Sequence, residues 1–311
     1  MVARRRSLGR DLPNLGIFLQ VLRRLGAIGV MVLGIAACGG SSSNSATQTI
    51  SLTRAADVSA GAHGYKSVMS MQESVPSLGQ LTIAGNGSFS SSTHAGSMTM
   101  QMNIPSAAAQ QAGLSNARFQ VVLVPGTVYM KLPPQLAEKL PGAKPWWEIN
   151  LAQAGKLAGI PGLSSLINGT SSESDPGQYL YFLRATSSGS VKDLGQETIN
   201  GIQTTHYRAE IDLQKLPDAV PARDRAGVEQ LTAALQKRAG LPSGLPMNVW
   251  IDSHQLIRQI ETNFSESVNG QAITVAMKEN FLDYGPQPAP QIPPPDQTVN
   301  LVKLLQQHGV G

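Results

Sequence analysis

The sequence predicts an α+β fold, in which one face of a long antiparallel sheet is wrapped around a few helices. Three observations lead to this prediction. Ten segments have the composition and alternation of strands, and short turns join most of them. The helical patterns gather in the middle of the chain. Neither a βαβ alternation nor a Gly-rich phosphate loop is present. A closed barrel is the main alternative arrangement of the strands.

The first 37 residues have the pattern of a secretory signal peptide. Six arginines accompany the apolar run Leu25–Ala37, whose 13 residues are too few to span a bilayer. The run ends in Ile35-Ala36-Ala37-Cys38, which resembles the bacterial lipobox. In a lipobox the cysteine receives a diacylglyceryl group and becomes the mature N-terminus, and two or more acyl chains anchor a protein stably. The alternative is a chance cysteine behind an ordinary signal peptide.

Charge and cysteine content exclude several functions. Residues 1–37 hold six of the 24 Lys+Arg and one of the 20 Asp+Glu, which leaves 18 basic and 19 acidic residues. A nearly neutral exported chain lacks the electrostatic footprint of a nucleic-acid-binding protein. Cys38 is the only cysteine, so a disulfide framework and a cysteine zinc site are excluded.

Composition divides the chain into four parts. A signal peptide of the lipoprotein type is predicted over residues 1–37, and a flexible Gly/Ser tether from Cys38 over residues 38–50. The main domain is predicted over residues 51–285. Residues 286–311 form a proline-rich tail, in which a short helix is predicted at Val299–Gln307.

The strands are predicted in two series, separated by the helical middle. Pro125-Gly126, Asn200-Gly201 and Asn269-Gly270 are turn signals, and such short connections require antiparallel pairing. The predicted strands are Tyr65–Glu73, Gln80–Ser90, His94–Ile104, Arg118–Val124, Thr127–Leu132, Val191–Ile199, Ile202–Leu213, Met247–Asp252, Leu256–Ser267 and Gln271–Tyr284.

Three helices are predicted in the middle of the chain. Asp175-Pro176 is a suitable N-cap and first-turn pair for a helix whose apolar side chains lie within Tyr179–Leu183. Asp224–Ala239 has an amphipathic pattern, and a shorter helix is predicted over Asn150–Ala158.

Sequence templates for catalysis are absent. The chain has no G-x-S-x-G elbow, H-E-x-x-H pair or Walker loop. His206 lies in an alternating strand pattern and is interpreted as a strand-face residue, while Asp212 and Asp252 end strands, where carboxylates start turns. We therefore expect a protein that is not an enzyme and needs no cofactor. The five histidines are scattered: His63, His94, His206, His254 and His308.

The stretch "SMTMQMNI" places three methionines on alternate residues of a strand. Met98, Met100, Met102 and Ile104 then share one face. Thioethers suit copper(I), so a soft-metal site is one interpretation. No cysteine joins the set and Ile104 continues the row, so an apolar wall is preferred. Because methionine adapts to irregular shapes, the wall suits a ligand cavity as well as it suits a plain core.

Several segments together resemble a known group of lipoproteins. In this order and behind a lipobox, they are similar to the actinobacterial LppX/LprG-type lipoproteins and to the wider LolA/LolB-like group of lipid carriers. The resemblance covers most of residues 60–295, and its motifs are signatures of strands and turns. The segments are "VYMKLP", "KPWWEINLAQ", "DPGQYLYFLRATSSGSVKDLGQETINGIQTTHYRAEIDLQKL", "LPMNVWIDSHQLIRQIETNF" and "FLDYGPQPAPQIPPP".

The resemblance implies a curved antiparallel half-barrel, with helices over its open face and an apolar cavity inside. Members of the group carry acylated glycolipids or lipoproteins across the periplasmic space. Some relatives of this shape serve as sensor or accessory domains, so the fold does not settle the function.

These observations predict a lipoprotein of the cell membrane, anchored on the extracytoplasmic side, that binds and carries an acylated lipid or glycolipid. Membrane lipids and a membrane transporter are the expected partners. Two alternatives stay open: a structural or regulatory lipoprotein without a ligand, and a copper(I)-binding protein. For the Arg118–Val124 strand either face is apolar. The predicted lining is Met69, Met71, Leu81, Ile83, Met98, Met100, Met102, Val121 and Leu123, with Leu180 and Leu183 on a movable cover.

Overall fold

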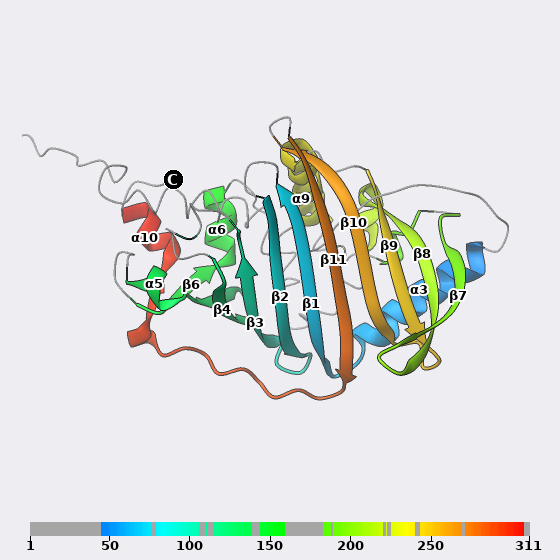
Figure 1. The fold of residues 1–311 in the computed structure, drawn as a ribbon, viewed down its shortest axis with the longest axis horizontal. Helices are drawn as coiled ribbons and strands as arrows, with labels where there is room; N and C mark the ends of the chain where they lie inside the picture. Colours follow the sequence, from blue (N-terminus) through cyan, green and yellow to red (C-terminus); the bar gives the residue numbers. More distant parts are fainter. Residues whose placement is uncertain are drawn as a thin grey trace, which may run out of the picture.

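A computed structural model describes the chain over residues 45–75, 79–105, 110, 115–138, 144–158, 183–187, 189–219, 222, 225–239, 243–268 and 271–307. Within these residues, 12 strands form one curved, open sheet (Figure 1). The strands are β1 (Gly64–Val75), β2 (Gly79–Ser90), β3 (Ala95–Asn103), β4 (Ala117–Val124), β5 (Thr127–Lys131), β6 (Trp146–Asn150), β7 (Lys192–Ile199), β8 (Ile202–Asp212), β9 (Gly244–Asp252), β10 (Ile257–Val268), β11 (Gln271–Tyr284) and β12 (Thr298–Asn300).

The sheet consists of two meanders that meet at one central pair of strands. Its order is β12-β6-β5-β4-β3-β2-β1-β11-β10-β9-β8-β7. Strands β1 to β6 pair consecutively, as do β7 to β11, and β1 pairs with β11 in the middle. Every pair is antiparallel except β12 with β6. The edges are β12 and β7, so the predicted antiparallel sheet is confirmed and the closed barrel is wrong.

Local turn chemistry explains the tight hairpins. Asn200 and Gly201 have φ angles of 51° and 81°, the left-handed pair that a type I′ turn requires between β7 and β8. Gly126, between β4 and β5, has a φ of 77°. Asp252 Oδ1 accepts the backbone N–H groups of His254 at 2.8 Å and of Leu256 at 3.0 Å. The turn role predicted for Asp252 is therefore confirmed.

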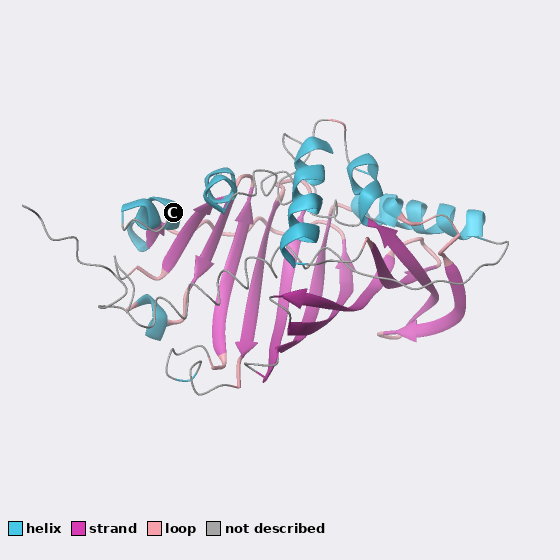
Figure 2. Cartoon of the chain, turned by 90° about the horizontal axis from the view of Figure 1, so that it is seen from above, coloured by secondary structure: helices cyan, strands magenta, loops and turns pink. Residues whose placement is uncertain are grey.

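The longer helices lie on one side of the sheet (Figure 2). Asn150 caps α6, because its Oδ1 accepts the N–H of Gln153 at 3.0 Å, and Asn300 caps α10 through Lys303 at 2.9 Å. The helices predicted in the middle at Asn150–Ala158 and Asp224–Ala239, and the terminal one, are confirmed as α6, α9 and α10. The helices are α3 (Ser45–Ala60), α5 (Pro134–Ala137), α6 (Leu151–Ala158), α8 (Leu216–Ala219), α9 (Arg225–Ala239) and α10 (Leu301–Gln307), with short 3-10 turns at Leu213–Lys215 and Pro295–Gln297.

Helix α3 begins inside the segment that was predicted to be a flexible tether. The tether was expected over residues 38–50, but residues 45–50 belong to the helix. Leu52, Ala55 and Ala56 are completely buried along one side of α3, so packing of small residues stabilises a helix that lacks a strong amphipathic pattern. Residues 38–44, including Cys38, lie outside the described residues, as does the predicted signal peptide.

The domain was predicted to end at residue 285, but the proline-rich tail contributes a further strand to the sheet. After β11 the chain runs along the ends of the strands and reaches the far edge of the sheet (Figure 1). There β12 adds a parallel strand to β6, and Lys144 Nζ donates hydrogen bonds to the carbonyl oxygens of Thr298 at 3.0 Å and Pro295 at 3.3 Å. The sheet therefore continues beyond residue 285, into the predicted tail.

Candidate ligand-binding face

The register of the sheet places the predicted lining residues on one face. Residues directly opposite each other in neighbouring strands point to the same side. Met71 is opposite Ile83, which in turn is opposite Met102. We call this side the inner face. Its predicted members among the described residues are Met69, Met71, Leu81, Ile83, Met98, Met100, Met102, Val121 and Leu123, all of which the register brings to this side.

The choice of face in β4 is now settled. Val121 is opposite Met98, and Leu123 is opposite Gly96. Gly96 lies on the same face of β3 as the methionines, because it precedes Met98 by two residues. Val122 and Val124 point to the other side, which we call the outer face. Val122 is only 6% exposed although it lies on the outer face. Both faces of β4 therefore carry buried apolar residues, and composition alone could not show which face is the inner one.

The helices cover the inner face most closely over β8 to β11. Leu52, Ala55 and Ala56 of α3 belong to the same hydrophobic core as Met71 and Val249 of the sheet. Ser59 Oγ accepts the backbone N–H of Ile257 at 2.9 Å, which ties α3 to β10. Along β8 to β11 most inner-face side chains are almost completely buried, although Tyr207, Met247 and Met277 are only partly buried. The side chains that are at most 5% exposed are Ala209, Ile211, Leu245, Val249, Ile251, Ile257, Ile260, Phe264, Ile273, Val275 and Phe281.

Cover over the methionines is less complete. Met71 and Met102 are 3% and 6% exposed, whereas Met98 and Met100, in the middle of β3, are only partly buried. We call the partly buried strip of the inner face over β3 to β6 the open strip. It consists of Met98, Met100, Leu123, Val128, Met130 and Ile149. An apolar strip with incomplete cover can receive an apolar ligand without dismantling the core.

Glycines shape the inner face next to the open strip. Gly85 is opposite Met69 on one side and Met100 on the other. A Cβ placed on Gly85 would lie 3.3 Å from Cγ of Met69 and 3.2 Å from Cγ of Met100. The two methionines therefore approach each other over the glycine. Because both side chains are flexible, this part of the wall can change shape around a guest.

The predicted cover is only partly described. Leu183 is 1% exposed and belongs to the hydrophobic core. The segment after it is fastened to β8, where Thr186 bridges to Ile211 and Ser187 N–H donates to the carbonyl oxygen of Glu210 at 2.7 Å. Arg184 forms an ion pair with Asp57 of α3. Leu180 lies outside the described residues.

Two carboxylates on the inner face were not anticipated. Glu73 is opposite Leu81 and Val275 and is 3% exposed, and Glu279 is opposite Met69. The period of two in β1 could have found Glu73, because it continues the row of Met69 and Met71. Lysines of the same strands alternate to the outer face, where Lys66 pairs with Asp283 and Lys278 pairs with Glu261.

Tyr284 shows how the end of β11 is sealed. Its hydroxyl donates to the carbonyl oxygen of Ile257 at 2.6 Å, and burial raises the pKa of this phenol well above its usual value. Its ring belongs to an aromatic group with Tyr65, Phe89 and Phe281. This end of the inner face is therefore packed core.

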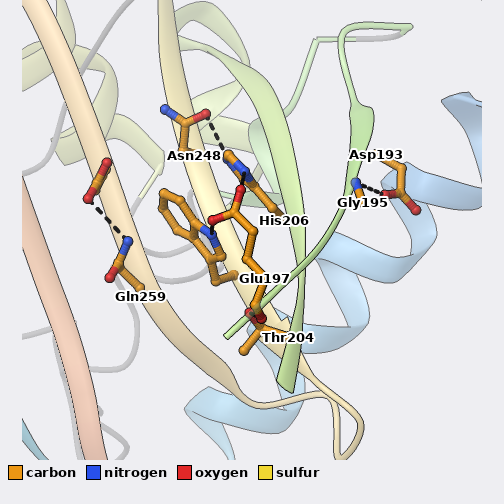
Figure 3. Close-up of polar contacts among 9 residues, drawn as sticks. Asp193, Gly195, Glu197, Thr204, His206, Asn248 and Gln259 are labelled. Atoms are coloured by element: carbon orange, nitrogen blue, oxygen red, sulfur yellow. Dashed lines mark hydrogen bonds and ion pairs between the residues drawn. The ribbon is translucent and has the colours of Figure 1, made fainter. Parts of the chain in front are cut away.

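His206 lies on the outer face, in a cluster of polar and aromatic side chains (Figure 3). Its ring stacks on Trp250 with centroids 4.2 Å apart, and its Nδ1 lies 2.8 Å from Glu197 Oε1. Its Nε2 lies 3.1 Å from Asn248 Oδ1. Both ring nitrogens thus have neighbours within the sheet, which agrees with the predicted strand-face role.

Glu197 is the acceptor at the centre of that cluster. Trp250 Nε1 donates to Glu197 Oε2 at 2.8 Å. Hydrogen bonds from Trp250 and then His206 lower the pKa of the Glu197 carboxyl below its usual value. The donors are neighbouring strand residues, so the cluster fastens β7 to β8 and β9.

The described part of the chain has neither a clustered metal site nor a membrane-spanning helix. Among the described residues no group of three or more His, Cys, Asp or Glu side chains is arranged to hold a metal ion. Within those residues, too, every helix is too short or too polar to cross a membrane.

No protein-family model matches the sequence. The chain is similar to an uncharacterized 31.2 kDa protein of Streptomyces griseus, encoded between rplA and rplJ, with 26% identity over 170 residues. That match covers 54% of this chain and 52% of the other protein, so the chain spans about half the length of the curated relative that it matches.

Among solved structures, the chain is similar to the lipoprotein LppX of Mycobacterium tuberculosis, with 12% identity and a TM-score of 0.41 over 80% of this chain and 99% of that one. LprF of Mycobacterium bovis gives 14% identity and a TM-score of 0.41 over 81% and 99% of the two chains. A LolA superfamily protein of Nitrosomonas europaea gives 7% identity and a TM-score of 0.24 over 80% and 96%.

Proposed function

We propose that this protein is a lipoprotein anchored to the cell membrane through acylated Cys38, and that it binds and carries an acylated lipid or glycolipid against its inner face. The open strip is the observation that carries the proposal. It is apolar, it is partly uncovered, and it joins a row of methionines that can change shape. A membrane transporter is the expected partner for delivery or collection of the lipid.

The proposed mechanism needs no covalent step, so the protein is not an enzyme. Acyl chains that leave a bilayer lose contact with other chains, and a protein surface must shield them from water. Shielding contributes about 25 cal/mol per Å2 of apolar surface, so each 100 Å2 of chain covered contributes about 2.5 kcal/mol.

Lipid content of the purified protein tests this proposal. The full chain with Cys38→Ser, which removes the anchor, is expressed with its signal peptide in a bacterial host and studied by native mass spectrometry and solvent extraction. We expect a lipid adduct in stoichiometric amount. Met100→Trp fills the open strip and should reduce the adduct at least tenfold, whereas Gln101→Trp, on the exposed outer face, should leave it unchanged.

A wild-type protein without lipid, even after incubation with vesicles of the host's lipids, would contradict lipid carriage. The same result would favour a structural or regulatory lipoprotein that docks on an envelope complex. Equal lipid content in the Met100→Trp and Gln101→Trp variants would leave lipid binding in place but exclude the open strip as its site.

Copper(I) binding is a second candidate, favoured by one observation. Met69 and Met100 come from different strands, yet their Cγ atoms both lie within 3.3 Å of the point above Gly85 where a Cβ would stand. Thioethers gathered in this way suit copper(I). Titration with copper(I) should then give tighter binding to wild type than to a Met98/Met100/Met102→Leu variant, and equal affinities would exclude these methionines as ligands.

A further inference from the structure

Helix α3 is a fixed part of the domain. Its buried side contributes Leu52, Ala55 and Ala56 to the core. Near its end, Ser59 Oγ binds the backbone of Ile257 at 2.9 Å, and Asp57 Oδ1 accepts a hydrogen bond from Arg184 Nε at 3.0 Å. These contacts hold residues 52–59 of the helix against the sheet. Because an α-helix is continuous and stiff over 16 residues, they also restrict the position of its first residue, Ser45.

The chain between this point and Cys38 is short. Six residues, 39–44, separate Cys38 from Ser45, where α3 begins. Fully extended, this distance is at most about 25 Å, whatever conformation these six residues adopt. The sheet is much wider, because 12 strands at their usual spacing extend over roughly 50 Å. The anchor therefore reaches only the part of the domain around the start of α3.

That part of the domain is the β7 edge of the sheet. Helix α3 starts on the β7 side of the molecule, whereas β12 and α10 lie at the opposite end (Figure 1). Asp193 and Gly195 of β7 lie beside α3 (Figure 3). Strand β7 is exposed along most of its length, and its Leu194 side chain is 47% exposed.

Strand β7 is also shaped as a protected edge. Gly195 has a φ of 100° at an irregularity in the β7–β8 register, and its N–H is bound by Asp193 Oδ1 at 2.8 Å. A bulge of this kind disfavours addition of another strand. Leu194 lies between Asp193 and Gly195, and a single exposed apolar side chain of this kind is ordinary on a protein surface.

We propose that the β7 edge faces the membrane that holds the Cys38 acyl chains, and that the β12–α10 edge points away from it. The proposal rests on the anchor at Cys38 and adds the orientation of the domain. The far edge, with β6, α6 and the open strip nearest to it, then extends into the space beyond the membrane. An edge-on orientation also leaves both faces of the sheet accessible.

Energy transfer to a labelled membrane tests this orientation. In the anchored protein the Cys38 thiol is acylated, so an introduced cysteine is the single free thiol of the chain. Gln196→Cys in β7 and Gln306→Cys in α10 are a matched pair, because both glutamines are exposed. Each full-length lipoprotein is labelled with a donor maleimide and reconstituted in vesicles of phosphatidylcholine and phosphatidylglycerol that carry rhodamine-labelled phosphatidylethanolamine.

We expect the transfer efficiency from residue 196 to be at least twofold higher than that from residue 306. Insertion of 20 Gly/Ser residues after Gly40 should reduce this ratio, because the longer segment releases the orientation. Equal efficiencies in the protein of natural length would mean that the domain lies flat, and a higher efficiency from residue 306 would mean the reverse orientation. Either result overturns the proposal.

Failure of the anchor would give a different result. In a density gradient, vesicles rise and carry bound protein with them. If neither the chain with Cys38 nor the Cys38→Ser variant rises with the vesicles, the proposed anchor is wrong, and the proposed orientation is then wrong as well. If only the wild type stays with the vesicles, the anchor is retained and the transfer ratio alone decides the orientation.

Discussion

The two meanders of the sheet use the same inner face in different ways. Over β8 to β11, helices α3 and α9 lie against branched and aromatic side chains that are mostly buried, with Met247 and Met277 partly exposed among them. Over β1 to β6, the inner face carries glycines and methionines, and the open strip remains partly exposed. The first region is a rigid support, and the second is an adaptable surface. Stability and ligand binding are thus assigned to different parts of one sheet.

Truncation of one phenylalanine in each region should give the largest difference. Phe281 of β11 is 1% exposed and packs edge-on against Tyr65 with centroids 5.3 Å apart, so Phe281→Ala should lower the free energy of unfolding by about 3–5 kcal/mol. Phe119 of β4 is opposite the flexible Met100, which can move into the space left by Phe119→Ala. The loss there should be at least about 1 kcal/mol smaller.

Urea denaturation of both variants, with the slope of the transition as a control for two-state unfolding, measures the two losses. Equal losses would mean that the methionine region is as rigidly packed as the region under α3. In that case the contrast between support and adaptable surface would be lost.

Alanine substitutions at two inner-face glycines of β2, Gly85 and Gly87, should differ in their effect on stability by a smaller amount. Here a side chain is added rather than removed. A Cβ on Gly87 would lie 2.6 Å from the carbonyl oxygen of Ser97, which is fixed in the neighbouring strand. Gly87→Ala should therefore lower the free energy of unfolding by about 1–3 kcal/mol. A Cβ on Gly85 would lie 3.2 Å from the carbonyl oxygen of Thr99, a much milder contact than the one at Gly87. Its other near neighbours are Met69 and Met100, which can turn away, so Gly85→Ala should cost less than Gly87→Ala, about 1 kcal/mol.

Thermal unfolding of the two alanine variants gives the comparison directly. The lipid content of Gly85→Ala adds a second measurement, since its methyl group would narrow the open strip without changing the core. A larger loss of stability for Gly85→Ala than for Gly87→Ala would show that the methionines cannot move.

A substitution on the outer face, Glu197→Gln, should have the smallest effect on the free energy of unfolding, and its effect should depend on pH in the acidic range. The pKa of Glu197 is lowered by hydrogen bonds from Trp250 and His206, so its carboxylate stabilises the folded state above the usual pKa of a glutamate. That contribution is lost as the pH falls through the lowered folded-state pKa. Urea unfolding between pH 6 and pH 3, followed by Trp250 fluorescence, should show wild type losing stability more steeply than Glu197→Gln. Parallel pH profiles would contradict this assignment.

Most strands could be predicted because their signals are local. Alternation, turn glycines and the Asn200-Gly201 pair act within a few residues, and all ten predicted strands are present. β6 and β12 were missed for a different reason. They are short, and β12 exists because it pairs with β6 from a distant part of the chain. Helix α3 was missed because tertiary packing of small residues, rather than an amphipathic pattern, defines it.

The candidate site was predictable to the same extent. A period of two places Met98, Met100 and Met102 on one side without any knowledge of the partner strands. Which of them stays partly exposed depends on where α3, α6 and α9 lie, and the sequence contains no local signal for that. The inner face of β4 was likewise decided by its register with Met98, since Val121 and Val122 are equally apolar.

The pairing of β1 with β11 has a consequence for how the chain folds. Each meander can form from neighbouring hairpins, but the central seam joins segments such as Met71 and Met277 that lie far apart in sequence. Contacts of this kind form slowly, because a long loop must close first. Until β11 pairs with it, the edge of β1 that faces away from β2 has unpaired backbone N–H and C=O groups along its whole length. The period before the seam closes is therefore when this chain is most prone to pair wrongly with another copy.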